Sequence, residues 1–317
     1  MCFSPKLTEI MKRFFSKNQK KEPKKDVHVA LIFKDFAAWL KASCVGLNVA
    51  GYTTADVLTK QGYDVSVFPV RHNIDIVNAI DKYHETHDHK LTHVVISAPW
   101  LSLHDLKALL NHFKQINFVI LSHSNVGFLQ ADPWGVELYR HYIELTKTYK
   151  NLRVGGNSEK FVKWLNKAYD YNGVLLPNLY PISYDVKPKP VWDGKSTIKI
   201  GAFGAPRAEK NFMTAAAAAL LIQKETGANI ELHMNSGGEE QNRVTMAIEQ
   251  MFKDLPNAKL IKHDWAYWND FIKIISDMDL MLQPSYTESF NMVTADGISV
   301  GVPSVVSPAI YWCPNSW

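Results

Sequence analysis

The sequence has few cysteines and no long apolar run. Its three cysteines are Cys2, Cys44 and Cys313, and an odd number at such spacings excludes a disulfide framework and a cysteine-built zinc site. The longest stretch without a polar residue in the alanine-rich segment is 215–222, much shorter than the ~20 residues that span a bilayer. Because no apolar stretch follows the basic start, no signal peptide is expected, and the sequence predicts a cytoplasmic protein.

The overall composition is that of an ordinary globular protein. Hydrophobic residues make up 46% of the chain and charged residues 21%, which excludes a disordered or collagen-like protein. The length of 317 residues exceeds the ~100–200 residues of a typical domain, so two domains are predicted.

Excess positive charge is missing from most of the chain. Residues 1–25 carry a net charge of +6, so the remaining residues carry −2 of the overall +4. A protein that binds nucleic acid through its body would carry the excess there, so a nucleic-acid partner is not expected. Apolar residues in the tail recur at helical spacing, which favours peripheral contact with an anionic membrane: Leu7, Ile10, Met11, Phe14 and Phe15. A basic, flexible tail that stays solvated is the alternative.

From residue 27 the chain alternates short β-rich apolar runs with longer amphipathic ones. Strands are predicted at 27–33, 64–68, 93–97, 118–121, 152–154 and 173–176, and later at 197–203, 229–234, 259–261, 280–283 and 304–306. Helices are predicted between them, among others at 105–113, 134–147, 212–226, 243–255, 268–276 and 292–300. This alternation is typical of βαβ units with parallel sheets, so the predicted fold class is α/β.

A segment rich in proline and lysine, 181–195, interrupts the alternation and predicts a linker. It separates two Rossmann-like domains in tandem, one over 26–180 and the other over 196–317. The second domain stops just after a strand, where a doubly wound domain would usually continue with a helix. We therefore expect it to be incomplete at its C-terminus.

Ligands bind open α/β sheets beyond the carboxyl ends of the strands, and one such end carries glycine and positive charge. Gly204 follows the predicted strand 197–203, and Arg207 and Lys210 precede the next helix. Backbone N–H groups at a helix N-terminus favour an anion, so the segment predicts a diphosphate site. A glycine used only for packing in a βα turn is the alternative.

Two carboxylates follow the predicted strand 280–283. Glu288 falls in the loop and Asp296 in the early helix, which opens near Asn291 and Met292. Glu288 can reach a sugar hydroxyl and Asp296 a ribose diol, since carboxylates accept paired hydrogen bonds from diols. Asn291 and Met292 are further candidates for binding a nucleotide sugar. Alternatively, Glu288 only complements the helix dipole, and Asp296 is a solvated helix residue.

Several of these segments resemble one known family. Residues 279–285, 288–290 and 295–307 resemble the Glu-x7-Glu region of group 1 (family four) glycosyltransferases. Segment 204–211 is similar to that family's phosphate loop, and 237–238 to its next glycine turn. These are retaining enzymes of the GT-B fold, with two Rossmann-like domains facing across a cleft. The resemblance implies an acceptor-side N-terminal domain, a nucleotide-sugar-binding C-terminal domain and a hexosyltransferase-like activity.

The resemblance also implies roles for single residues. Arg207 and Lys210 would stabilise the β-phosphate of the departing nucleoside diphosphate, and Glu288 would contact the donor sugar. His123 matches a histidine that faces the donor sugar, although a lone histidine after a strand is often only structural. Gly46 matches the loop over the nucleotide.

The sequence departs from the family pattern at two positions. Asp296 stands in place of the second glutamate and is one methylene shorter. Ala205 stands where the family usually has the loop arginine, and Arg207 follows two residues later.

Two groups of side chains could be mistaken for sites. The first is a run of histidines: His84, His87, His89 and His93. Because it spans a helix end and a loop, a solvated connection is expected and no metal site. The second is aromatic: Trp265, Tyr267 and Trp268. Stacking on a base or sugar and packing in the core or between domains both stay open for it.

The sequence therefore predicts a metal-independent transferase without a cofactor. It would move a sugar from a nucleoside-diphosphate donor to a hydroxyl of a glycan, a lipid or another acceptor, with retention of configuration. Two alternatives stay open. One is a non-catalytic nucleotide-sugar-binding protein on the same scaffold, favoured by Asp296 and Ala205. The other is a DNA-modifying glycosyltransferase, in which residues 1–25 would contact phosphates.

Overall fold

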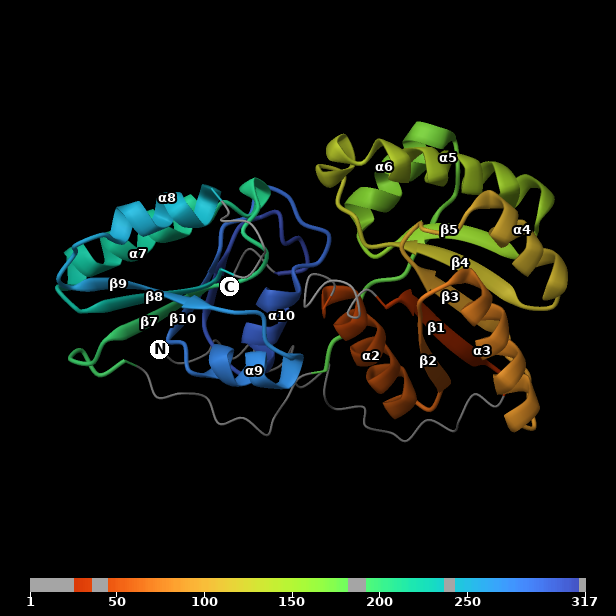
Figure 1. Ribbon diagram of the computed structural model, residues 1–317, viewed down its shortest axis with the longest axis horizontal. Coiled ribbons are helices and arrows are strands. Elements are labelled where there is room, and N and C mark those ends of the chain that lie inside the picture. The colour runs from red at the N-terminus through yellow and green to blue at the C-terminus, as the bar shows by residue number, and fades with distance from the viewer. Residues whose placement is uncertain (1–25, 36–44, 182–191, 237–242, 314–317) are drawn as a thin grey trace, which may run out of the picture.

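The computed structural model describes residues 26–35, 45–181, 192–236 and 243–313, which form two α/β halves, each around one parallel sheet (Figure 1). The predicted tail, most of the predicted linker and the predicted glycine turn at 237–238 lie outside the described residues. In the described part of the chain, no helix is both long and apolar enough to cross a bilayer.

The first sheet has six parallel strands in the order β2-β1-β3-β4-β5-β6. Their bounds are β1 (His28–Lys34), β2 (Asp64–Val70), β3 (His93–Ser97), β4 (Asn117–Ser122), β5 (Leu152–Gly156) and β6 (Val174–Leu175). The chain passes from β1 to β2 on one side and then returns to β3 on the other. The carboxyl ends of β1 and β3 therefore flank a topological switch point, where doubly wound sheets bind ligands.

Helices cover both faces of this sheet, which explains why the middle residues of its central strands are mostly apolar and buried. The helices are α2 (Val45–Lys60), α3 (Asn73–Thr86), α4 (Leu103–His112), α5 (Pro133–Thr148) and α6 (Glu159–Tyr169). Ala30 and Ile32 of β1 are buried in one core with residues of α3 to α6. Phe33 packs on the other side, against Tyr52 of α2. Gly51 permits that approach, because a Cβ there would lie 3.0 Å from the Phe33 ring.

Local signals in the sequence begin these helices. The side chains of Ser102 and Ser158 accept hydrogen bonds from backbone N–H groups in the first turns of α4 and α6. Asp132 does the same for α5, and Pro133 follows it at the first helical position.

The second sheet has five parallel strands in the order β11-β10-β7-β8-β9. Its strands are β7 (Ile198–Ala202), β8 (Ile230–Asn235), β9 (Ala258–His263), β10 (Leu280–Gln283) and β11 (Ser304–Val306). Its helices are α7 (Phe212–Thr226), α8 (Arg243–Phe252), α9 (Trp268–Ser276) and α10 (Met292–Ser299). The helices α7 and α8 cover one face, and α9 and α10 cover the other (Figure 1).

Every predicted strand is present, so the α/β fold class is confirmed. The largest difference among the predicted helices is at α8, which ends at Phe252 rather than at 255. The backbone of Asp254 is left-handed, with φ of 58°, and Pro256 follows two residues later. Both features stop a helix, since proline disfavours helical geometry in the residue before it.

Candidate functional site

Lys210 and Glu288 form a buried ion pair at the carboxyl edge of the second sheet. Lys210 ends the 3₁₀ turn η2 (Ala208–Lys210) after β7, and Glu288 lies in the loop between β10 and α10. The Lys210 Nζ and Glu288 Oε1 atoms are 2.6 Å apart, and the side chains are 15% and 6% exposed. The two residues are 78 positions apart in the chain and meet because β7 and β10 are neighbouring strands.

Three donors hold the Glu288 carboxylate at one oxygen. Besides Lys210 Nζ, Ser285 Oγ donates to Oε1 at 2.7 Å and Asn291 Nδ2 at 2.8 Å. Over the residues that the structure describes, no hydrogen bond reaches Oε2. The partners are side chains, not the backbone N–H groups that a helix-capping carboxylate accepts from. The carboxylate is therefore fixed in place and can accept further hydrogen bonds at Oε2.

Asn291 connects this carboxylate to the start of α10. Its backbone has φ of 66°, a left-handed conformation that asparagine tolerates better than most residues. Its Oδ1 accepts from the Thr294 N–H at 2.8 Å and caps α10, while its Nδ2 donates to Gln283 Oε1 and Glu288 Oε1. Met292 opens the helix, and its sulfur lies 3.7 Å from Asn178 Nδ2.

The segment predicted as a phosphate loop follows β7 and includes Gly204 and Arg207. Gly204 has φ of 117°, which only glycine adopts readily, and its N–H donates to Asn235 Oδ1 at 2.9 Å. Arg207 is half exposed, with its Nε 3.4 Å from Glu209 Oε1. Its guanidinium lies 5.9 Å from the ring centre of Phe128, a residue of the N-terminal half.

Asp296 is almost fully buried, so the alternative of a solvated helix residue is wrong. Its Oδ1 accepts hydrogen bonds from the Tyr180 hydroxyl and, at 2.9 Å, from Trp268 Nε1. Burial raises the pKa of Asp296 to about 6, although both hydrogen bonds act in the opposite direction. Trp268, one of the three aromatic residues noted in the sequence, is thus a hydrogen-bond partner of this carboxylate. Tyr267 beside it is exposed.

His123 follows β4 and is the sequence-predicted candidate in the N-terminal half. Asn157 Nδ2 lies 3.4 Å from its Nδ1, whereas its buried Nε2 has no hydrogen-bond partner over the described residues. Burial lowers the pKa of His123 to about 4, so the ring is neutral near pH 7. A buried ring nitrogen without a partner is available to a ligand or to water.

A direct contact joins the loops that carry His123 and Glu288. Thr287 Oγ1 donates to Asn125 Oδ1 at 3.1 Å. Gly127 permits the approach, because a Cβ there would lie 2.8 Å from the Thr287 methyl carbon. The carboxyl edges of the two sheets thus meet at the loops in which the sequence predicted donor-binding residues.

Gly46 is not in a loop, in contrast to the prediction. It lies in the first turn of α2, is exposed, and would have no atom within 4 Å of an added Cβ. The segment from Val45 to Lys60 forms one continuous helix. Residues 36–44, which precede it, lie outside the described residues.

The connection that carries the histidine run is exposed at residues 85–88 and 90, as predicted. His89, however, contacts Asp64 and stacks on His28, which begin β2 and β1. These two partners were not part of the prediction. The signal that could have found them is the pairing of β1 with β2, which puts the first residues of both strands side by side.

No protein-family model matches the sequence, and no curated protein matches it. Solved structures do match. An alpha-glucosyltransferase in complex with UDP and a 13-mer DNA containing an HMU base is 15% identical, with a TM-score of 0.56, over 90% of this chain and 81% of that one. Sucrose-phosphate synthase from Thermosynechococcus elongatus is 16% identical, with a TM-score of 0.56, over 92% and 83% of the two chains. The catalytic domain of starch synthase IV from Arabidopsis thaliana, bound to ADP and acarbose, is 10% identical, with a TM-score of 0.53, over 89% and 83%.

The fold is that of the GT-B glycosyltransferases. The predicted architecture of two Rossmann-like sheets is therefore confirmed. On this GT-B chain, Lys210 and Glu288 lie at the carboxyl edge of one sheet and His123 at that of the other, and the contact between Thr287 and Asn125 joins the two edges.

Proposed function

We propose that this protein is a glycosyltransferase that moves a sugar from a nucleoside-diphosphate donor to an acceptor hydroxyl. The observation that carries the proposal is the buried Lys210–Glu288 pair at the carboxyl edge of a GT-B sheet. An ammonium group suits the diphosphate of such a donor, and a carboxylate suits the hydroxyls of its sugar. A buried ion pair is weak as a stabilising device, because desolvation offsets the attraction, so stability alone does not explain it.

The positive groups of the second half fit the leaving diphosphate. As the bond from the sugar to the β-phosphate breaks, negative charge grows on the phosphate oxygens. Lys210 and Arg207 would meet this charge, together with the N–H groups at the start of α10. Gly204, with no side chain, lets the phosphates approach the backbone after β7.

Polar atoms that lack a hydrogen-bond partner over the described residues are candidates for contacts with the donor. Glu288 Oε2 would accept from a sugar hydroxyl while Oε1 stays held by its three donors. His123 Nε2, buried and without a partner over the described residues, would hydrogen-bond the donor sugar from the opposite sheet. A ribose contact to Asp296 Oδ2 would require Tyr180 and Trp268, which bury this carboxylate, to move aside.

Two finer features belong to the same proposal. With the diphosphate held by Lys210 and Arg207, the acceptor would attack from the same face, so that the configuration at the sugar is retained. These cations would do for the leaving group what a metal ion does in other transferases. We therefore expect release of nucleoside diphosphate to continue in EDTA, and a loss that magnesium or manganese restores would contradict metal independence.

The experiment that tests the function is a donor screen followed by a turnover assay. Unfolding of the full chain is measured with UDP-, GDP- and ADP-sugars, since a ligand at about 100 times its Kd stabilises a protein by ~2.7 kcal/mol. The donor that stabilises is then tested for release of its nucleoside diphosphate. Stabilisation without release would favour a binding protein, and no stabilisation by any donor would overturn the proposal.

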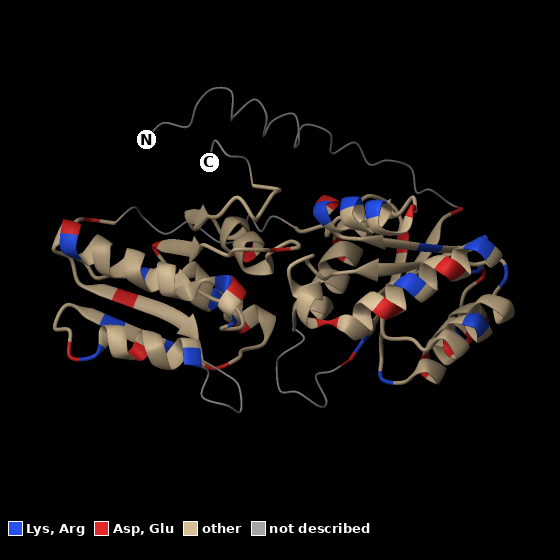
Figure 2. Ribbon diagram, turned by 90° about the horizontal axis from the view of Figure 1, so that it is seen from above, with Lys and Arg blue, Asp and Glu red and all other residues tan. Residues whose placement is uncertain are grey.

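A transferase that acts on DNA is a second candidate. It is favoured by the similar solved structure that contains UDP and DNA. Against it, basic and acidic residues are interspersed along the helices of both halves (Figure 2), and the chain beyond residue 25 carries −2. Transfer of a labelled sugar to duplex DNA, with salt-sensitive binding of the duplex, would establish this candidate.

A further inference from the structure

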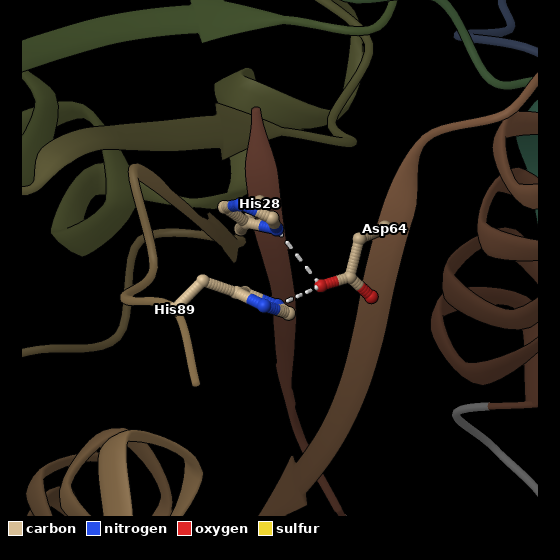
Figure 3. A group of neighbouring side chains, drawn as sticks. All are labelled: His28, Asp64 and His89. Carbon is tan, nitrogen blue, oxygen red and sulfur yellow. Dashed lines mark hydrogen bonds and ion pairs between the residues drawn. The ribbon is translucent and has the colours of Figure 1, made fainter. Parts of the chain in front are cut away.

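Three side chains from separate parts of the N-terminal half converge on one point. His28 is the first residue of β1, Asp64 is the first residue of β2, and His89 lies between α3 and β3. His28 Nδ1 is 3.0 Å from Asp64 Oδ2, and His89 Nε2 is 2.6 Å from the same oxygen (Figure 3). The two imidazole rings stack with their centres 3.6 Å apart, so both nitrogens face the carboxylate.

Several polar groups gather at this carboxylate oxygen. Besides the two imidazoles, the Tyr83 hydroxyl donates to Asp64 Oδ2 at 2.6 Å, and it is also 2.7 Å from His89 Nε2. A cation held between the imidazoles and the carboxylate would take the place of the two imidazole hydrogen bonds, because each nitrogen would then present a lone pair rather than a proton.

We propose that His28, Asp64 and His89 bind a divalent transition-metal ion of the Zn²⁺ type. Two imidazoles and a carboxylate are ligands of zinc, nickel and copper, whereas calcium and magnesium take oxygen ligands only. The three ligand atoms lie within 4.8 Å of one another. Two neutral imidazoles and one carboxylate carry a net charge of −1, which favours a cation.

The burial of the three side chains fits an ion that enters from solvent. The His28 side chain is only 12% exposed and is held in place by its surroundings, while Asp64 and His89 are 40% and 39% exposed. Ligands around zinc at ~2.0–2.2 Å lie farther apart than the present 2.6 Å and 3.0 Å contacts, so the two exposed side chains move outward slightly. The open side leaves a coordination position for water.

Tyr83 would support the metal site by hydrogen-bonding a ligand rather than by binding the ion itself. Its side chain is buried, and its hydroxyl donates to Asp64, as groups around metal-binding carboxylates commonly do.

The place of this site separates it from sugar transfer. It lies at the amino ends of β1 and β2, at the opposite edge of the sheet from His123 and the loops that meet the second half. A metal here would connect two strands and the segment before a third, and would stabilise the N-terminal half. It would not touch the nucleotide sugar, so the inference stands apart from the proposed function.

The test is Zn²⁺ binding to the full chain without a histidine tag, after dialysis against a chelator. Isothermal titration calorimetry should give one site, and Co²⁺ in its place should give the visible bands of a low-coordinate cobalt–imidazole complex. His89→Ala and Asp64→Asn should abolish that site. Tyr83→Phe keeps the buried ring and should weaken binding by only ~10–100-fold, as expected for an outer partner. The matched control is His104→Ala, an exposed histidine of α4, which should bind as the unchanged chain does.

Two measurements distinguish the metal site from a hydrogen-bonded cluster. Zn²⁺ should raise the unfolding temperature of the unchanged chain and of His104→Ala, but not that of Asp64→Asn. Circular dichroism of each variant shows whether it is folded, and Tyr83→Phe keeps the test decisive if an alanine variant is not. Equal Zn²⁺ affinity in the unchanged chain, Asp64→Asn and Tyr83→Phe would overturn the proposal, as would the absence of any site in the unchanged chain.

Discussion

Because the Lys210–Glu288 pair is largely buried, removing either residue should have a larger effect than at an exposed pair. On the surface, such a pair would contribute little to stability and nothing to chemistry. Here the pair is buried and Glu288 has two further donors, so removing one partner has consequences of two kinds. One is the free energy of the charge left buried without its partner, and the other is the loss of a group that, under the proposed function, binds the donor.

The two residues should differ in which ligand they affect. If Lys210 contacts the phosphates as proposed, Lys210→Ala should weaken binding of both the bare nucleoside diphosphate and the sugar donor. If Glu288 contacts the sugar as proposed, Glu288→Ala should weaken binding of the sugar donor only. Turnover should fall by ~10²–10³-fold in each, by analogy with loss of one preorganised polar group. Calorimetry with both ligands and a turnover assay measure these effects.

A second ion pair on β7 gives a control for the loss of a lysine. Lys199 Nζ lies 2.6 Å from Asp277 at the opposite end of β7, so Lys199→Ala removes an ion pair of the same length, but a more exposed one, away from the site. It should leave turnover unchanged. Lys210→Ala should also destabilise the fold by ~1–3 kcal/mol, since the Glu288 carboxylate stays buried without its cation. Near-normal turnover in Lys210→Ala or Glu288→Ala would refute the assigned roles. So would an equal loss of affinity for the bare nucleoside diphosphate in the two variants.

Asp296 should make stability depend on pH. Its pKa is raised from 3.8 to about 6 in the folded chain, so the folded state binds more protons than the unfolded state between those values. Stability therefore falls as pH rises through this window, by about 1 kcal/mol between about pH 5 and about pH 7.5. Denaturant unfolding of the unchanged chain and of Asp296→Asn at both pH values measures it. The difference in the free energy of unfolding between the two pH values should be smaller in Asp296→Asn than in the unchanged chain. An equal difference in both would show that Asp296 does not cause the pH dependence.

At the scale of the element, α10 begins at a residue with an unusual backbone. Asn291 has φ of 66°, caps the helix and donates to Glu288. Asn291→Gly keeps the left-handed backbone and loses the side chain. Glycine replaces an N-cap at a cost of only about a few tenths of a kcal/mol, but the lost hydrogen bonds to Gln283 and Glu288 should bring the total to ~1 kcal/mol. Asn291→Ala also forces a Cβ into that conformation, which adds ~1–2 kcal/mol. Denaturant unfolding measures both, and an alanine variant as stable as the glycine variant would show that the backbone relaxes.

Asn291 should also affect the donor through Glu288. Because its Nδ2 holds Glu288 Oε1, both variants should bind the sugar donor more weakly while keeping affinity for the bare nucleoside diphosphate. Asn211 offers a control, since it opens α7 with φ of 56° but donates to Pro284 O and not to the carboxylate. A variant Asn211→Gly with the same loss of sugar-donor affinity would show that helix placement, not the contact to Glu288, is responsible.

At the scale of the whole molecule, charge is divided between a short tail and the rest of the chain. Residues 1–25 carry +6, and all other residues carry −2. Deletion of 1–25 should leave donor binding and the unfolding temperature unchanged, and should remove binding to phosphatidylserine vesicles. Each Lys or Arg near an anionic surface contributes ~1 kcal/mol, so the loss should be large and sensitive to salt. Vesicle sedimentation at low and high salt checks this, with neutral phosphatidylcholine vesicles as control, and equal sedimentation of both chains would contradict it.

The sequence by itself determined the secondary structure and the fold class. Short apolar runs predict strands, and apolar residues at helical spacing predict helices. Both are local properties of the chain, so strands such as β4 and helices such as α7 could be located from composition and spacing. The candidates Gly204, Lys210 and Glu288 could be found in the same way, because each follows a strand and ligand sites lie beyond strand ends.

Only the tertiary structure decided which of these residues meet. The Lys210–Glu288 pair depends on β7 and β10 being neighbours, and sheet order is set by packing over the whole domain rather than by any local segment. From its own helix alone, Asp296 could be a surface residue. In the structure it is buried beside Tyr180 and Trp268, and this burial raises its pKa. His28, Asp64 and His89 are likewise unremarkable one by one, because their chemistry depends on parallel strands that begin side by side. Contacts between residues far apart in the chain cannot be read from spacing, and the proposed site and the proposed metal site are both built from such contacts.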